Sequence, residues 1–224
     1  MEIKVLKNIL DANETIARKN QLRLSKLRIL TINIMSSPGA GKTSLILQTI
    51  NRLKPQVRIA VIEGDVASRI DADRVHREGV PVVQINTGGG CHLDANMTEN
   101  ALNNLPLEQV DLLFIENVGN LICPAEFDLG EHKKVMLLSA PEGDDKPHKY
   151  PLMFTEADVV LVNKIDLMPH VDFNMIAFNK VVTGLNPRAE IFPVSCKTGD
   201  GLEGWISWLK NELEQMKKPG RREH

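Results

Sequence analysis

Several features that mark other protein classes are scarce in this 224-residue sequence. The 27 basic and 29 acidic side chains leave a formal net charge of −2, whereas proteins held on nucleic acid by bulk charge are usually strongly basic. Aromatic residues make up 4% of the chain, too few to favour binding through base stacking. No run of about 20 apolar residues is present, as a membrane-spanning helix would require. We therefore expect neither nucleic acid nor a membrane as a partner.

Cysteine is also scarce. The three cysteines are an odd number at wide spacing, which is a poor framework for disulfides and suits a reducing compartment. Residues 1–7 mix charges among their apolar side chains and lack the apolar core of a signal peptide. Both observations favour a cytoplasmic protein.

Short apolar runs alternate with amphipathic segments along most of the chain. Strands buried on both faces and separated by helices are typical of a parallel sheet. The predicted fold class is therefore α/β, a mostly parallel sheet flanked by helices, with an extra N-terminal helix. The predicted strands are 29–35, 57–62, 80–85, 111–115, 135–138, 159–162 and 191–194, and the later helices are 42–53, 69–77, 96–102, 173–183 and 202–216.

We expect three parts along the chain. Residues 1–27 form a helical arm, because their apolar residues recur near helical spacing. This arm either caps the core or presents a surface to a partner. Residues 28–216 form the main domain, and the charged residues 217–224 form a tail that we expect to fray.

A glycine-rich loop follows the first predicted strand and opens the next helix. Residues 36–43 match the phosphate-loop pattern G-x-x-x-x-G-K-[ST], except that Ser36 stands at the first glycine. Such a loop directs backbone N–H groups and a helix N-terminus at phosphate oxygens. Lys42 would contact the β- and γ-phosphates and Thr43 would bind Mg²⁺; a ligand-free glycine turn is the alternative. The predicted phosphate-binding residues are Ser37, Pro38, Gly39, Ala40, Gly41, Lys42, Thr43 and Ser44.

The segment Asn163-Lys164-Ile165-Asp166 follows a later strand and predicts recognition of guanine. The Asp166 carboxylate can accept hydrogen bonds from N1–H and the 2-amino group of guanine, whereas adenine would leave it unpaired. Lys164 would lie along the base and Asn163 would hold the loop; the alternative is a surface turn. GTP is therefore the predicted nucleotide. The other side of the base would be supported, mainly through backbone N–H groups, by Ser195, Cys196 and Lys197.

Two acidic segments, 63–65 and 116–119, end other predicted strands. Ligands bind beside the carboxyl ends of strands in open α/β sheets. We expect Asp65 first and Glu116 second to hold Mg²⁺ or orient the attacking water, with the Gly119 N–H on the γ-phosphate. The alternatives are solvated carboxylates or helix caps, and the division of roles with Glu63 stays open. The predicted catalytic residues are Lys42, Asp65 and Glu116, and the predicted magnesium ligands are Thr43, Asp65 and Glu116.

Cys91 and His92 stand side by side in a glycine-rich loop, and Cys123 lies just beyond the second acidic segment. Thiolate and imidazole ligands suit Zn²⁺ or Ni²⁺ far better than Mg²⁺. Three ligands are one fewer than a closed tetrahedral site needs, which invites a water or a second copy of the chain. Chemistry alone leaves open two half-buried cysteines and an unrelated histidine.

The order of these motifs resembles the hydrogenase nickel-incorporation GTPase family (HypB), within the dimer-activated proteins of the phosphate-loop NTPase fold. The resemblance runs from about residue 29 to residue 213 and includes the Cys-His pair and the second cysteine. Its motifs are Ser-Ser-Pro-Gly-Ala-Gly-Lys-Thr, Glu-Gly-Asp, Gly-Gly-Gly-Cys-His-Leu-Asp, Glu-Asn-Val-Gly-Asn-Leu-Ile-Cys, Glu-Gly-Asp-Asp-Lys-Pro, Asn-Lys-Ile-Asp and Ser-Cys-Lys-Thr-Gly.

The resemblance implies slow, switch-like GTP hydrolysis coupled to delivery of nickel to nickel–iron hydrogenase. It implies a Ni²⁺ or Zn²⁺ site made by Cys91, His92 and Cys123 in loops inserted in the GTPase domain, at the interface of a GTP-promoted homodimer. The implied partners are the nickel- and zinc-binding co-chaperone HypA and the hydrogenase large subunit. The sequence has no histidine-rich tract of the kind that stores nickel in some members, so we expect no storage role.

Several alternatives remain at this level. A urease-maturation GTPase, a metal-buffering protein with weak nucleotide turnover and a small-molecule kinase are the rivals. The acidic and basic run 142–149 is either a solvated loop, or a segment from which Lys146 or Lys149 reaches a neighbouring subunit or its nucleotide.

Overall fold

The computed structural model describes residues 2–66 and 69–218, with side chains from Leu10 onward. These residues form one seven-stranded sheet in the order β3-β2-β4-β1-β5-β6-β7, and every neighbouring pair is parallel. The predicted fold class is therefore confirmed, with a sheet that is parallel throughout. The strands are β1 (Leu30–Ser36), β2 (Ile59–Asp65), β3 (Val82–Asn86), β4 (Leu112–Glu116), β5 (Lys133–Ser139), β6 (Val159–Asn163) and β7 (Glu190–Pro193).

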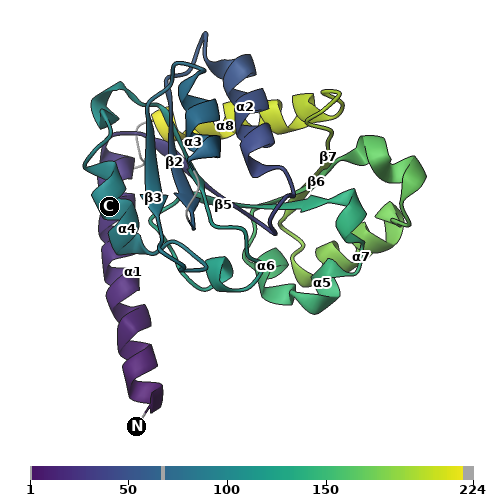
Figure 1. Ribbon diagram of the computed structural model, residues 1–224, viewed down its shortest axis with the longest axis horizontal. Coiled ribbons are helices and arrows are strands. Elements are labelled where there is room, and N and C mark those ends of the chain that lie inside the picture. Colours follow the sequence, from purple (N-terminus) through teal and green to yellow (C-terminus); the bar gives the residue numbers. More distant parts are fainter. Residues whose placement is uncertain (1, 67–68, 219–224) are drawn as a thin grey trace.

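Helices cover both faces of the sheet (Figure 1). Side chains alternate between the faces of a strand, so β1 sends Ile32 and Ile34 into the core under α2 and α8, and Met35 into the core under α6 and α7. A third apolar cluster lies under α1 and α4. The helices are α1 (Glu2–Lys26), α2 (Lys42–Leu53), α3 (Ile70–His76), α4 (Ala95–Leu102), α5 (Lys146–Lys149), α6 (Pro151–Thr155), α7 (Met175–Leu185) and α8 (Leu202–Lys217).

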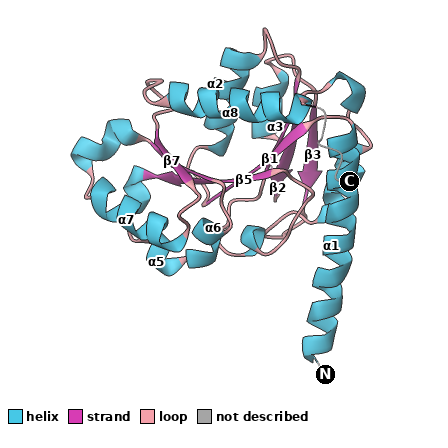
Figure 2. Cartoon of the chain, turned by 180° about the vertical axis from the view of Figure 1, so that it is seen from behind, coloured by secondary structure: helices cyan, strands magenta, loops and turns pink. Residues whose placement is uncertain are grey.

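The N-terminal helix α1 packs on the domain through its C-terminal half. Leu24 is fully buried, and the Asn20 amide donates to the carbonyl oxygens of Ala95 (2.9 Å) and Leu129 (3.0 Å). The N-terminal end of the helix projects away from the body in both views (Figures 1 and 2). One end of this helix therefore anchors to the core while the other extends beyond it.

Two sequence expectations need adjustment. Helix α8 continues to Lys217, and residues 219–224 of the predicted tail lie outside the described residues. The segment expected as a loop at 142–149 contains the short helix α5, because Pro147 sits in its first turn, where a fixed φ and a missing N–H are tolerated. Within the described ranges, no helix has the length and apolarity to cross a membrane.

Candidate functional site

The candidate site forms where parallel strands end at the same edge of the sheet. The phosphate loop follows β1, the acidic segments end β2 and β4, and Asn163 ends β6. The chain order of these strands differs from their order in the sheet, where β2, β4 and β1 are neighbours. Parallel pairing therefore brings together motifs that are far apart in the sequence.

The phosphate loop has the backbone geometry that its glycines allow. Gly39 and Gly41 have φ values of +76° and +110°, a region that residues with a Cβ rarely occupy. Ser36 has no positive φ, so serine is tolerated where the pattern has glycine. Its hydroxyl accepts a hydrogen bond from Lys42 Nζ at 3.2 Å, which holds the lysine over the loop at the N-terminus of α2.

A cavity of ≈ 460 Å³ lies in front of this loop and contacts the ends of β2 and β4. Lys42, Thr43 and Gly119 line it, as does Asp65, so the structure brings these predicted residues together. Gly119 lies so close to Pro38 that an added Cβ would be 2.9 Å from its backbone. The cavity is also lined by Asp71 and Arg74 of α3, which no motif in the sequence marks.

Two buried carboxyl groups, Glu63 and Glu116, face one another at the floor of the site. They are register partners on β2 and β4, with 3% and 6% of their surfaces exposed. Burial, and then repulsion by Glu116, raises the pKa of Glu63 to about 10. Burial also raises the pKa of Glu116, against the opposing effect of Lys42. The sequence leaves open how Glu63 shares a role with Asp65 and Glu116, whereas its raised pKa follows from its pairing with Glu116 across the sheet.

These residues fit a divalent cation. The Thr43 hydroxyl donates to Glu116 Oε1 at 3.0 Å, so the two predicted magnesium ligands are adjacent. Glu63 Oε1 and Glu116 Oε2 are buried with no hydrogen-bond partner among the described residues. A bound cation would satisfy such oxygens and favour their ionised forms. Hydroxyl and carboxylate oxygens are also the ligands that Mg²⁺ prefers.

The guanine-recognition motif lies on the other side of the phosphate loop. It borders a second cavity of ≈ 240 Å³ that also contacts Gly41 and Ser44. The Asn163 amide donates to Ala40 O at 2.9 Å and accepts from the Cys196 N–H at 3.1 Å. This side chain therefore holds the phosphate loop and the loop after β7 together, as expected of a loop-holding asparagine.

The other residues of this motif also engage their expected neighbours. Lys164 Nζ donates to Gly39 O at 2.7 Å, which lays the lysine across the loop. The Ser195 hydroxyl donates to Asp166 Oδ1 at 2.6 Å and orients that carboxylate. Lys197 and Cys196 line the cavity. Burial raises the pKa of the Cys196 thiol to about 11, which makes it a poor metal ligand.

The three predicted soft-metal ligands form a cluster on the loops that follow β3 and β4. Cys91 Sγ lies 3.2 Å from Cys123 Sγ and 3.6 Å from His92 Nδ1, and the ligand atoms of all three residues lie within 4.8 Å of one another. The His92 ring stacks on Phe127 with centroids 4.1 Å apart. Cys91 is exposed, and the other two residues are partly buried. One metal ion can contact all three residues and still have an open coordination position.

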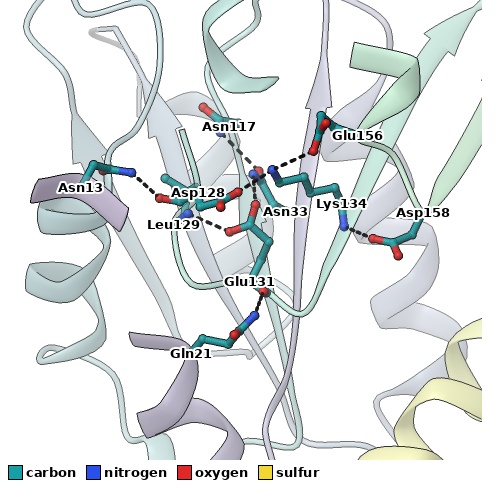
Figure 3. A network of polar contacts seen from close by, with 10 residues as sticks. All are labelled: Asn13, Gln21, Asn33, Asn117, Asp128, Leu129, Glu131, Lys134, Glu156 and Asp158. Carbon is teal, nitrogen blue, oxygen red and sulfur yellow. Dashed lines mark hydrogen bonds and ion pairs between the residues drawn. The ribbon is translucent and has the colours of Figure 1, made fainter. Parts of the chain in front are cut away.

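A buried polar network includes Asn33, Asn117 and Glu131, which Figure 3 shows together. Asn117, directly after Glu116, accepts from the Leu93 N–H at 3.2 Å and donates to Asn33 Oδ1 at 3.2 Å. The Asn33 amide donates in turn to Glu131 Oε1 at 3.1 Å. Burial raises the pKa of Glu131. Because Leu93 follows His92, the network joins the loop that carries Cys91 and His92 to the end of β4 and to β1.

The run 142–149 also reaches the phosphate loop. The Ser37 hydroxyl is hydrogen-bonded to the Glu142 carboxylate, and Lys146 Nζ donates to Glu142 O at 2.6 Å. Lys149 forms an ion pair with Asp145. This segment is therefore attached to the nucleotide site of its own chain. That one of its lysines reaches a neighbouring subunit stays a prediction.

The parallel sheet with a glycine-rich loop opening α2 defines a phosphate-loop nucleotide-binding protein. The family described as CobW/HypB/UreG, nucleotide-binding domain, matches residues 30–193. The hydrogenase maturation factor HypB of Escherichia coli K12 is 46% identical over 212 residues, which cover 95% of this chain and 72% of that protein. The chain belongs to the HypB family of hydrogenase maturation factors.

Two solved structures are similar over almost their whole length. The crystal structure of hydrogenase maturation factor HypB from Archaeoglobus fulgidus has a TM-score of 0.85 at 42% identity, and covers 91% of this chain and 99% of that one. The structure of HypB from Helicobacter pylori in complex with nickel has a TM-score of 0.87 at 38% identity, and covers 94% and 99%. The resemblance inferred from the motifs is confirmed.

Proposed function

We propose that this protein is a GTP-hydrolysing metallochaperone that delivers nickel during maturation of nickel–iron hydrogenase, with metal transfer coupled to GTP-dependent dimerisation. The observation that carries the proposal is the Cys91, His92 and Cys123 cluster, whose ligand atoms lie within 4.8 Å of one another. It lies on loops that leave the same sheet edge as the phosphate loop. Nickel here is the cargo, and a thiolate and imidazole set suits it.

The nucleotide chemistry follows from the two cavities on either side of Gly41. The phosphate cavity offers backbone N–H groups and Lys42 to the triphosphate, with Mg²⁺ held by Thr43, Glu116 and Asp65. The buried Glu63, which pairs with Glu116 in the sheet, would support this cation site. The second cavity offers Asp166 to the edge of guanine. We expect this hydrolysis to be slow and switch-like.

Dimerisation follows from the incomplete ligand set. Three side chains leave a tetrahedral ion one ligand short, and a two-fold axis beside an exposed cysteine would supply the same residues from a second copy. GTP that orders the loops at the ends of β2 and β4 would thereby stabilise both the dimer and the metal site. Hydrolysis would release both together.

We further propose the biological setting that the family suggests. The free thiols of the cluster need a reducing compartment, so the protein works in the cytoplasm. Its partners are the co-chaperone HypA and the hydrogenase large subunit. Residues 28–216 form the GTPase domain and residues 1–27 an accessory arm.

The test combines metal titration with sedimentation in the presence of GDP or a non-hydrolysable GTP analogue, each with Mg²⁺. We expect the analogue to produce a dimer and to change the nickel affinity of the wild-type protein. Cys91→Ala and Cys123→Ala should lose nickel binding, while Cys196→Ala, which keeps its backbone N–H, should bind nickel normally. Equal nickel affinity and equal dimer dissociation in both nucleotide states would refute the coupling.

A transfer assay identifies the recipient. Nickel-loaded protein is mixed with metal-free hydrogenase large subunit or with metal-free urease, with and without GTP. We expect GTP-dependent transfer to the hydrogenase subunit. Transfer to urease alone would support a urease-maturation GTPase. Nickel binding without measurable GTP hydrolysis would support a metal buffer.

A further inference from the structure

Asn120 is attached to the phosphate loop through its backbone. Its N–H donates to Ser36 O at 2.8 Å, and the Ser36 hydroxyl accepts from Lys42 Nζ. The preceding residue, Gly119, packs directly on Pro38. The peptide between Gly119 and Asn120 therefore follows any movement of the phosphate loop or of a phosphate bound beside it.

The Asn120 side chain is attached to the cysteine-bearing segments. Its amide nitrogen donates to Cys91 O at 3.3 Å, and its amide oxygen accepts from the Ile122 N–H at 3.0 Å. Ile122 directly precedes Cys123. A single short amide thus holds the backbone beside both thiols, while its own backbone is fixed to the nucleotide site.

His92 is held by different groups. Its ring stacks on Phe127, and the next residue, Leu93, donates its N–H to Asn117 Oδ1. The Leu93 side chain packs on Gly64, where an added Cβ would lie 2.8 Å from Leu93 Cδ1. A displacement of Asn120 would therefore move the two thiols relative to the imidazole, and three ligands bind one metal ion only when their geometry is right.

We propose that Asn120 is a positioning residue that couples the nucleotide state to metal affinity, by moving Cys91 and Cys123 relative to His92. This inference rests on the proposed function and names the side chain through which that coupling acts. The residue touches neither reacting atoms nor metal in this role. Its two side-chain hydrogen bonds and its backbone bond to Ser36 carry the effect.

The experiment measures the ratio of the nickel dissociation constants with GDP and with a GTP analogue. For the wild-type protein we expect a ratio of roughly 5 or more, in the range of allosteric couplings. In Asn120→Ala the ratio should fall to within about twofold of 1, while the nucleotide still binds, because the backbone bond to Ser36 remains. Asn104→Ala is the matched control: this exposed amide, in the turn after α4, donates to Asn100 O of that helix, and the ratio should match the wild type.

The outcomes separate the two proposals. A wild-type ratio of 1 refutes the coupled function and this inference with it. A wild-type ratio well above 1 that persists in Asn120→Ala refutes only this inference, even if nickel affinity falls equally in both nucleotide states. Coupling is reciprocal, so in the wild type nickel must change the ratio of the GDP and GTP-analogue dissociation constants by the same factor, and this effect must also be lost in Asn120→Ala.

A second variant guards against a misfolded alanine substitution. Asn120→Asp keeps the side-chain size and the acceptor for the Ile122 N–H, but cannot donate to Cys91 O. If Asn120→Ala fails to bind nucleotide, the same ratio measured in Asn120→Asp decides the question. Loss of the ratio supports the inference, and a wild-type ratio overturns it.

Discussion

The nucleotide site and the cysteine–histidine cluster lie at the same edge of the sheet but differ in construction. Lys42, Thr43 and Glu116 are buried, stand at the ends of a helix and a strand, and hydrogen-bond one another or their loop. Cys91 is exposed, and Cys91 and His92 lie in an irregular loop. The first site is assembled within one chain, whereas the second is one ligand short of a closed site.

This difference suits different tasks. Tight phosphate binding needs donors that are already oriented and shielded from water, since reorganisation would weaken the interaction. A metal that must be handed on needs an accessible position and ligands that can change their geometry. We therefore expect a substitution in one site to leave the affinity of the other site for its ligand nearly unchanged, when that affinity is measured without the first site's ligand.

The largest effect is expected from a substitution in the nucleotide site. Lys42→Ala removes the cation that we expect to contact the γ-phosphate, and GTP hydrolysis should fall about 10²- to 10³-fold, as for the loss of one preorganised donor. Nickel affinity in the nucleotide-free protein should not change. Steady-state phosphate release and a metal titration measure both. Lys54→Ala is the control, because this lysine forms an ion pair with Glu78 at the surface. Equal hydrolysis in the two variants would contradict the role predicted for Lys42.

A smaller effect is expected from a substitution in the cysteine–histidine cluster. Cys123→Ser should weaken nickel and zinc binding at least about 10- to 100-fold, the cost of losing even a supporting group, while GTP affinity in the absence of metal stays unchanged. Competition with a chelator of known affinity gives the metal constants. The matched control is Cys196→Ser, since that thiol is buried with a raised pKa. Equal loss in both variants would show that the binding site lies elsewhere.

The rigidity of the phosphate loop can be tested at Gly41. An alanine there would place its Cβ 2.4 Å from Asn163 Nδ2 at a φ of +110°. Strain of this kind costs about 1–3 kcal/mol, so we expect guanine-nucleotide affinity to fall roughly tenfold. Titration with a fluorescent GTP analogue measures it. Gly184→Ala is the control, because that helical glycine has open space and an ordinary φ; unchanged affinity in Gly41→Ala would mean that the loop adapts.

The smallest effect lies far from both sites, at His132. Its Nδ1 accepts from the Thr31 N–H at 3.1 Å and its Nε2 lies 2.9 Å from Ser25 Oγ, and burial lowers its pKa to about 4. Below the unfolded-state pKa of about 6.5, the unfolded chain takes up a proton that the folded chain does not. This stability is therefore present above pH 6.5 and is lost as the pH falls toward 4.

His132→Asn keeps an acceptor for the Thr31 N–H and cannot titrate. Between about pH 6.5 and pH 4.5, the free energy of unfolding of the wild type should fall by about 1–2 kcal/mol more than that of the variant, the value being reduced because the ring is partly exposed. Urea denaturation at several pH values measures the difference. Parallel pH profiles would show that His132 does not contribute. Nickel and GTP binding should be the same in both proteins.

The elements of the fold were largely predictable because each carries a local pattern. Strands such as β6 are continuous apolar runs, and the predicted bounds differ from the observed ones by only a few residues. The exceptions are α5 and α6, which are four and five residues long and have a proline in the first turn; they are too short for a helical period to show. The phosphate loop and the Asn163-Lys164-Ile165-Asp166 segment could likewise be located from the sequence, since each is a contiguous stretch; recognition of guanine by the second stays a prediction.

The predicted site was less complete where residues act across strands. Glu63 was seen as part of a motif, but its raised pKa follows from its position beside Glu116 in the neighbouring strand. Asn120 belonged to a quoted motif without a role, because its two side-chain partners are 2 and 29 residues away. Asp71 and Arg74 carry no motif at all. Each depends on non-local packing, which no window along the chain contains.

The amino-acid sequence by itself determined which reactive side chains are present: Lys42 in a glycine-rich loop, the Asp166 carboxylate, and two cysteines with a histidine. It also determined the alternation of buried strands and helices from which a parallel sheet follows. Only the tertiary structure decided that β2, β4 and β1 lie side by side, that Cys91 and Cys123 are 3.2 Å apart, and that Asn120 connects them to the phosphate loop. Contacts between strand ends depend on the order of strands in the sheet, and that order is set by packing of the whole domain.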